Sequence, residues 1–277
     1  MSTEQLRWLL KVIQPERTLA SLPGGAGVSQ ETHATLLGLP PEVYAAELGR
    51  MRAEAKEAAG ELLADPAVAS MVDRIPLQKG AKVVAFGDSL TSEPQSWAVI
   101  LSALLAARRA ADGISLIVSA VAGETTMQGL VRVGEVVGQQ PDWIFFLIGT
   151  NDARTQGSHP TKTLLHHEET ARNVAELRQR VSRETKARCV WITPPAVNEE
   201  HVAGHWGLAR FGVRFRNDDL ARVAQIVRDI DGPTIDVFSN LGTPPRADLL
   251  MGDGLHFTLA GQKRLALEVI KGWSNLI

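Results

Sequence analysis

Short apolar runs that alternate with helical segments dominate the chain from residue 82 onward. Each run is continuous, rich in β-branched or aromatic residues, and bounded by Gly, Pro, Asp or Asn. Continuous apolar character is typical of strands covered on both faces, as in a parallel sheet. The pattern predicts an α/β fold, a three-layer α/β/α sandwich with right-handed crossovers. The runs span residues 83–86, 114–121, 143–148, 189–192 and 235–238, and helical patterns fall at about 94–111, 125–138, 161–184, 218–229 and 258–273.

Polar segments lie at three boundaries of this pattern. Gly87-Asp88-Ser89-Leu90 follows the first run, and Gly149-Thr150-Asn151-Asp152 follows the third. Asp253-Gly254-Leu255-His256 comes just before the last helix. Because open α/β sheets bind ligands at the carboxyl ends of their strands, we expect the three segments to meet in one site.

The residue types in these segments suit acyl transfer. Ser89, on a strand-to-helix turn, would expose its hydroxyl near a helix N-terminus, where negative charge is favoured. His256 could take the serine proton while Asp253, three residues earlier, holds its tautomer. The Asn151 amide can donate a hydrogen bond to an oxyanion. Taken singly, each residue also has a structural explanation, such as a helix cap, an Asx turn or a solvated histidine.

A fourth segment, around Gly123, completes a pattern that resembles a known family. Gly123 ends the second run, where a glycine lets a backbone N–H approach a ligand, although an ordinary strand end also explains it. From about residue 82 to the C-terminus, the four segments resemble the sequence blocks of the GDSL, or SGNH, hydrolase family. The chain departs from the common pattern in having residues 1–79 before the first block, and in lacking Asn or Ser around Gly123.

The resemblance implies a fold and a set of roles. The fold would be a five-stranded, parallel, flavodoxin-like sheet. Ser89 would be the nucleophile, His256 the general base and Asp253 its partner. The oxyanion hole would consist of the Ser89 and Gly123 backbone N–H groups and the Asn151 amide.

The first 79 residues show helical patterns and no convincing strand. Leu6, Leu9, Leu10 and Ile13 share one helical face, and residues 42–63 have the composition of a stable helix. We predict a helical N-terminal extension over residues 1–79 and a catalytic domain over residues 80–277. Since the apolar faces of the extension need burial, we expect it to pack on the catalytic domain. Covering the pocket, or forming a homodimer through these helices, are further roles that the sequence leaves open.

Composition narrows the classes of function. The net charge of −2 and the pI near 6.4 show no excess of positive charge of the kind that binds nucleic acid. A single cysteine, Cys189, excludes an intrachain disulfide and a multi-cysteine metal site, and the spacing of His201 and His205 lacks the glutamate of a zinc-protease helix. No apolar stretch reaches the roughly 18 residues of a membrane span, and no signal peptide is visible. We expect a cytoplasmic protein with a small-molecule ester substrate, no metal and no cofactor, with secretion of a trimmed mature form left open.

A long segment between residues 193 and 218 contains Arg210, Arg214 and Arg216, interleaved with phenylalanines. It follows the fourth strand, on the expected side of the site. Arg210 and Arg214 could therefore bind an anionic group of a substrate, such as a carboxylate or a phosphate. Pairing with the two aspartates that follow, on a solvated face, is the interpretation we prefer slightly.

The sequence thus predicts a serine hydrolase that cleaves carboxylic esters through an acyl-enzyme intermediate, with deacetylation of a small or carbohydrate substrate as one form. An acyltransferase or a thioesterase would use the same residues and differ in pocket shape and water access. A non-catalytic binding module is a third class of function. A nucleotide-binding α/β protein is disfavoured, because the glycine-rich phosphate fingerprint is missing.

Overall fold

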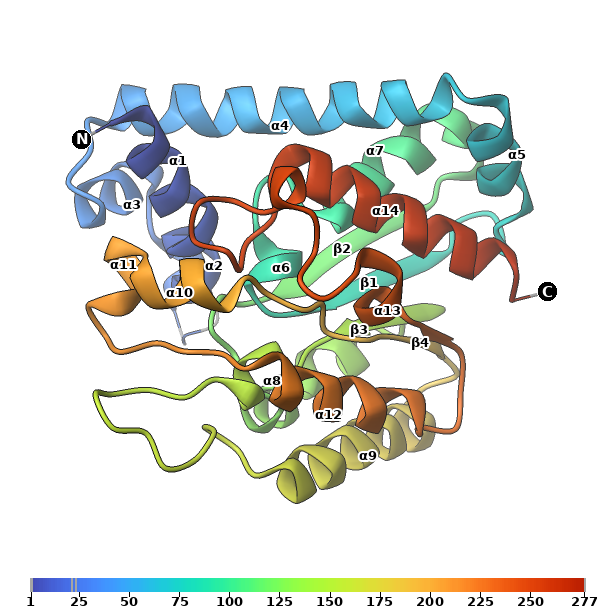
Figure 1. Cartoon of the computed structure of the whole chain (residues 1–277). Helices are drawn as coiled ribbons and strands as arrows, with labels where there is room; N and C mark the ends of the chain where they lie inside the picture. Colours follow the sequence, from blue (N-terminus) through green and yellow to red (C-terminus); the bar gives the residue numbers. More distant parts are fainter. Residues whose placement is uncertain (1, 21, 23, 277) are drawn as a thin grey trace.

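The computed structural model describes residues 2–20, 22 and 24–276, and a parallel sheet lies at its centre (Figure 1). The strands run in the order β2-β1-β3-β4-β5, and every neighbouring pair is parallel. This is the flavodoxin-like order, and it confirms the expected five-stranded parallel sheet. The strands are β1 (Lys82–Gly87), β2 (Ser115–Ala120), β3 (Trp143–Leu147), β4 (Arg188–Ile192) and β5 (Thr234–Ile235).

Alternate residues of the central strands face opposite layers of helices. Val83 and Ala85 of β1 pack with α7 (Trp97–Arg108) and α14 (Leu259–Ser274), which lie above the sheet in Figure 1. Val84 and Phe86 pack against the helices below the sheet. Because both faces are covered, the three-layer sandwich is confirmed. The helices below the sheet are α8 (Thr126–Gly138), α9 (His167–Glu184) and α12 (Asn217–Arg228).

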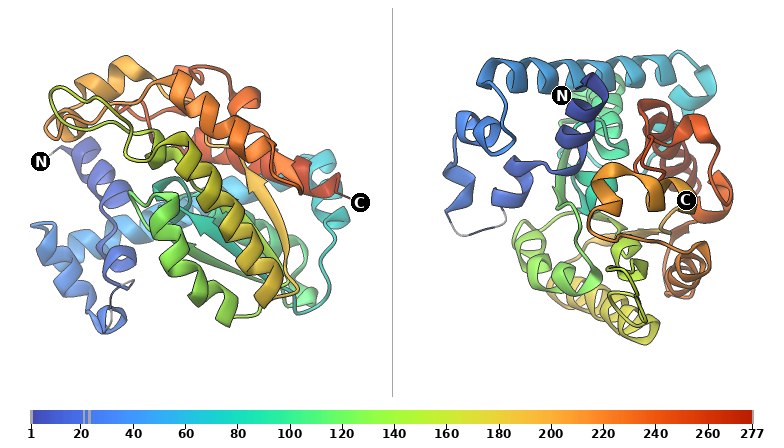
Figure 2. Two further views of the ribbon diagram at one scale, coloured as in Figure 1. Left: turned by 90° about the horizontal axis from the view of Figure 1, so that it is seen from below. Right: turned by 60° about the vertical axis from the view of Figure 1, so that its left-hand side comes forward.

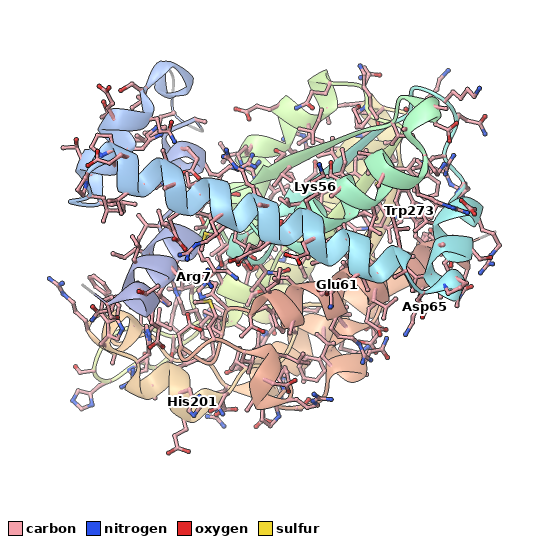
Figure 3. The ribbon with its side chains drawn as sticks, turned by 90° about the horizontal axis from the view of Figure 1, so that it is seen from above. Arg7, Lys56, Glu61, Asp65, His201 and Trp273 are labelled. Carbon is pink, nitrogen blue, oxygen red and sulfur yellow. The ribbon has the colours of Figure 1, made fainter. Side chains whose placement is uncertain are left out.

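Helices from the first 79 residues add to the upper side. The long helix α4 (Pro41–Leu63) lies over α7 and α14. Figure 3 shows it from above, with Lys56 and Glu61 along its length. Ala55 and Ala58 of α4 belong to the same hydrophobic cluster as Trp273 of α14. The core therefore continues across residue 80, and the division into two parts there stays a prediction. The N-terminal elements are α1 (Thr3–Val12), α2 (Pro15–Ala20), η1 (Gly25–Gly27), α3 (Gln30–Leu36), α4 (Pro41–Leu63) and α5 (Pro66–Arg74).

Helix α1 connects this N-terminal layer to the carboxyl edge of the sheet. Arg7 pairs with Glu47 and Glu54 of α4, whereas Trp8 packs in another cluster, with Leu208. Figure 2 shows α1, in dark blue, close to α10 (Glu199–Gly204) and α11 (Trp206–Ala209), in orange. The first helix therefore lies between α4 and the loops that follow the strands.

Two expected elements differ in extent. The fifth strand is shorter than the run 235–238, because Asp236 caps a helix, α13 (Val237–Leu241), by accepting the Ser239 backbone N–H. Helix α9 begins at His167, so residues 161–166 belong to a loop. In the described part of the chain, no helix is long and apolar enough to cross a membrane. The remaining short helices are α6 (Ser89–Ser92), η2 (Ala110–Asp112), η3 (Thr150–Ala153) and η4 (Ala247–Leu249).

Candidate active site at the carboxyl edge of the sheet

The turn after β1 presents Ser89. The backbone at Gly87 passes so close to β3 that a Cβ there would lie 2.3 Å from the Leu147 carbonyl oxygen, so only glycine fits. Asp88 then caps α6, its Oδ1 accepting the Leu90 backbone N–H at 3.0 Å. Ser89 is the first residue of α6, and no backbone or side-chain acceptor among the described residues meets its N–H. That N–H is therefore free to bind an oxyanion.

The segment before α14 brings a histidine and a carboxylate to this serine. Ser89 Oγ lies 3.0 Å from His256 Nε2, and His256 Nδ1 lies 2.6 Å from Asp253 Oδ2. Asp253 Oδ1 accepts the backbone N–H groups of Leu255 and His256, which fixes the turn. The exposed fractions are 7% for Ser89, 0% for Asp253 and 3% for His256. The structure thus brings together three sequence-predicted residues in a buried chain of hydrogen bonds.

The ionisation of Asp253 sets the direction of these hydrogen bonds. Burial alone would raise its pKa, but His256 and the backbone N–H donors outweigh burial and hold the pKa well below its usual range. Asp253 is therefore a carboxylate, and it accepts the proton on His256 Nδ1. An imidazole with its one proton on Nδ1 presents Nε2 as an acceptor for the Ser89 hydroxyl.

Trp8 of α1 is a further partner of Asp253. Its Nε1–H donates to Asp253 Oδ2 at 2.7 Å, and the indole is buried. Gly207 makes room for the ring, because a Cβ there would lie 2.5 Å from an indole carbon. One turn along α1, Lys11 pairs with Glu93 at 2.7 Å and donates to the Phe257 carbonyl at 2.8 Å. The N-terminal helix is thus bonded to the segment that carries His256, a contact that no local sequence signal indicates.

Asn151 and Gly123 line the same pocket as Ser89. Asn151 Nδ2 donates one hydrogen to the Glu124 carbonyl at 3.0 Å, which leaves the second amide hydrogen for a ligand. Gly123 has a φ of +81°, in the left-handed region, and its N–H has no acceptor among the described residues. The structure therefore places Ser89, Gly123 and Asn151 in the lining of one pocket, each with an N–H that has no acceptor among the described residues, and their joint role as an oxyanion hole stays a prediction.

Asp152 anchors the loop that carries Asn151. It is fully buried, and it accepts the Thr126 backbone N–H at 2.8 Å, the Thr126 hydroxyl at 2.5 Å and the Thr170 hydroxyl at 2.9 Å. Burial raises the pKa of Asp152, and these donors oppose the rise. Because Thr126 starts α8 and Thr170 lies in α9, Asp152 ties the loop to both helices of the lower layer.

The pocket at Ser89 is small and mostly apolar. Its volume is about 160 Å³. Arg154, which the sequence analysis did not single out, lies in its wall, although its position three residues after Asn151 was a usable signal. Helix α1 contributes Val12. The full lining is Val12, Ser89, Ala122, Gly123, Asn151, Arg154, Leu208, Val213, Phe215, Leu255 and His256.

The arginines that the sequence singled out lie outside this pocket. Arg214 lines a larger neighbouring cavity of about 720 Å³, which shares only Phe215 with the Ser89 pocket. Arg210 is exposed, and its guanidinium lies 5.5 Å from the Phe211 ring centre. Arg216 is 3.7 Å from Asp218 in an exposed pair, as the preferred interpretation expected. The larger cavity contains neither Ser89 nor His256, so the smaller one is the candidate active site.

Other polar side chains of interest are accounted for without a ligand. Within residues 2–20, 22 and 24–276, no group of three or more His, Cys, Asp or Glu side chains is arranged to hold a metal ion. Cys189 is a free thiol in β4, and burial raises its pKa to about 11, so it is a weak nucleophile. His167 Nε2 lies 3.1 Å from Asp219 Oδ1.

Comparison with known proteins shows which family the chain belongs to. Residues 85–264 match the model of the GDSL-like lipase/acylhydrolase family, and this match covers well over half of the chain. The chain belongs to this family. It is accordingly a carboxylic ester hydrolase of the GDSL type. A search of curated protein sequences finds no match.

Solved structures of similar fold include a lipase/acylhydrolase and two esterases. A lipase/acylhydrolase from Enterococcus faecalis has 23% sequence identity and a TM-score of 0.54, over 69% of this chain and 94% of that one. An acetyl-xylooligosaccharide esterase from Geobacillus has 21% identity and a TM-score of 0.53, over 71% and 95%. The acetyl xylan esterase AlAXEase has 20% identity and a TM-score of 0.54, over 71% and 100%. At these identities the likeness establishes the fold.

Proposed function

We propose that the chain is a serine esterase in which Ser89 is the nucleophile, His256 the general base and Asp253 the residue that orients it. The observation that carries this proposal is the buried chain of contacts from Ser89 Oγ to His256 and on to Asp253. A serine hydroxyl is a weak nucleophile until a neighbouring base accepts its proton. Here the ionised Asp253 leaves Nε2 free to be that base.

In the first half of the reaction, Ser89 Oγ attacks the ester carbonyl carbon while its proton moves to His256 Nε2. The carbonyl oxygen becomes an oxyanion, held by the Ser89 and Gly123 N–H groups and by the Asn151 amide. His256 then gives its proton to the departing alkoxide, and the C–O bond to the alcohol breaks. In the second half, His256 takes a proton from water, and the hydroxide attacks the acyl-serine. The acid leaves, and the proton returns to Ser89.

The size of the pocket favours a short acyl group. A volume of about 160 Å³ is below the roughly 300 Å³ at which drug-sized ligand pockets begin. Leu208, Val213 and Phe215 form an apolar wall suited to a methyl group. Two solved structures of similar fold are named as acetyl xylan esterases or acetyl-xylooligosaccharide esterases, which supports acetyl esters of carbohydrates as substrates.

The test is to assay wild type, Ser89→Ala and Ser92→Ala on p-nitrophenyl esters from acetate to palmitate. Ser92 is a matched control, since it is buried in the same short helix and its hydroxyl has no partner among the described residues. We expect Ser89→Ala to lose at least about 10⁴-fold in kcat, Ser92→Ala to stay active, and acetate to be the best acyl group. Near-normal turnover by folded Ser89→Ala would rule out the serine mechanism. Adding an alcohol acceptor to the wild-type assay distinguishes hydrolysis from acyl transfer.

A homodimer through the N-terminal helices and a cytoplasmic location both stay predictions. Four apolar side chains of that region are exposed and could form a contact between copies, namely Ile13, Leu22, Leu36 and Val43. Light scattering at micromolar concentration tests the dimer, and a monomeric mass would exclude it. Fractionation of cells that produce the full chain tests the location.

A further inference from the structure

One charged side chain in the Ser89 pocket has no partner. Arg154 lines the pocket together with Ser89 and His256. Its Nε is buried without a hydrogen-bond partner, and its guanidinium has no hydrogen bond or ion pair with any described residue. Desolvation by burial lowers the pKa of Arg154, and no neighbouring acid offsets that effect. An arginine stays charged under all ordinary conditions, so this pocket holds an uncompensated positive charge.

Other partly buried arginines of the chain do have partners. Arg132 forms a two-nitrogen contact with Glu124, with its closest approach at 2.6 Å. Arg109 pairs with Asp112 at 2.7 Å and also donates to two backbone carbonyls. The fold therefore supplies acceptors to guanidinium groups that serve structure alone. Leaving one partly buried and without an acceptor from the protein costs free energy, which an anionic ligand would recover.

The backbone explains why Arg154 points into the site. It directly follows η3, whose three-residue turn places the side chains at positions i and i+3 on the same side. Asn151 and Arg154 are three residues apart, and both line the pocket. The Arg154 N–H donates to the Asn151 carbonyl at 3.2 Å, and its own carbonyl accepts the Leu164 N–H at 2.7 Å. The guanidinium is thus attached to the same rigid turn as the oxyanion donor.

We propose that Arg154 binds a carboxylate of the substrate, so that the preferred substrates are small esters with a negative charge close to the scissile bond. The proposal rests on the esterase function assigned above to the same pocket. No Asp or Glu is among the residues that line the pocket, so a ligand carboxylate has no acidic neighbour there. The flat edge of a guanidinium matches the two oxygens of a carboxylate.

Matched ester pairs test this inference. 4-Nitrophenyl hydrogen glutarate and its methyl ester differ by a charge in the acyl part, and 3-acetoxybenzoate and its methyl ester differ by a charge in the alcohol part. A charged hydrogen bond of ordinary strength predicts that wild type prefers the anionic member of at least one pair by about tenfold or more in kcat/KM. Arg154→Gln should bring that ratio close to one. Arg154→Lys should keep part of it, since it keeps the charge without the two-pronged geometry.

Arg172→Gln is the control, because it removes an exposed guanidinium from α9 and should leave the ratio unchanged. Calorimetry on Ser89→Ala protein, with and without Arg154→Gln, measures binding of the same esters independently of turnover. The carboxylate site is overturned if the protein binds both members of both pairs equally. It is also overturned if Arg154→Gln keeps the preference for the anionic member. Arg154-dependent binding without turnover of any ester by wild type would support the carboxylate site and refute the proposed hydrolysis.

Discussion

In the mechanism we propose, the hydrogen bond from Trp8 to Asp253 makes a helix near the N-terminus a positioning element for His256. The perturbation that isolates it is Trp8→Phe, which removes the Nε1–H and keeps most of the apolar ring. Asp253 Oδ2 would then keep His256 Nδ1 as its donor, while Oδ1 keeps the Leu255 and His256 N–H groups. The carboxylate would remain in place with one donor fewer.

The expected magnitude follows from those contacts. A hydrogen bond to a charged acceptor contributes about 1.5–3 kcal/mol, so the free energy of unfolding should fall by about that amount, together with a smaller loss from packing. Because three donors still orient Asp253, kcat/KM should fall only about tenfold, far less than the roughly 10⁴-fold that misdirecting a triad histidine causes. A carboxylate with fewer donors attracts the imidazolium more strongly. The acid limb of the pH profile of kcat/KM should therefore move to higher pH.

The assay is kcat/KM on p-nitrophenyl acetate between pH 5 and 9, alongside urea unfolding of the same samples. Trp206→Phe is the matched control, since this indole is 51% exposed and packs on Trp8 without contacting Asp253. The control should keep the wild-type pH profile. If folded Trp8→Phe has both the wild-type kcat/KM and the wild-type acid limb, the Trp8 contact does not position the histidine.

Three further predictions concern other parts of the site. Asn151→Ala should lower kcat roughly 10²–10³-fold with little change in KM, and a change confined to KM would contradict its oxyanion role. Burial raises the pKa of Asp88 to about 7, so the folded chain holds the proton more tightly than the unfolded chain and loses stability as pH rises from about 4 to 7. In urea titrations, the free energy of unfolding of Asp88→Asn should rise relative to that of wild type over this pH window, by at most about 4 kcal/mol. If the two free energies change with pH in parallel, the raised pKa of Asp88 is refuted. Deletion of residues 2–14 should abolish ester hydrolysis, because Trp8, Lys11 and Val12 are lost, and an active truncated enzyme would show that α1 is dispensable.

The central part of the fold was predictable because its strands are covered on both faces. β1 and β3 are continuous apolar runs in the sequence, and in the structure almost all of their residues are buried. The fifth run was the exception. Val237 and Leu241 bury apolar side chains from a helix instead of a strand, and a short apolar run cannot distinguish these two cases.

The site was predictable where residues follow strand ends directly. Ser89 and Asn151 come just after β1 and β3, so the parallel sheet alone brings them to one edge. Trp8 could not be found in this way, since its contact with Asp253 joins residues 245 positions apart and depends on how α1 packs. Arg210 was singled out for its charge, but charge does not say which way a loop residue points.

The contact between Trp8 and Asp253 also bears on when the enzyme becomes competent during its synthesis. Trp8 leaves the ribosome well before the carboxylate that it contacts, which is made 245 residues later. Until that segment emerges, α1 can pack on α4 through Leu10 and Arg7, but Trp8 has no acceptor for its Nε1–H. We therefore expect the hydrogen bond between Trp8 and Asp253 to form only after residues 253–256 have been made. In the mechanism we propose, shorter chains that lack residues 253–256 would lack the general base and its partner, so we expect them not to cleave esters.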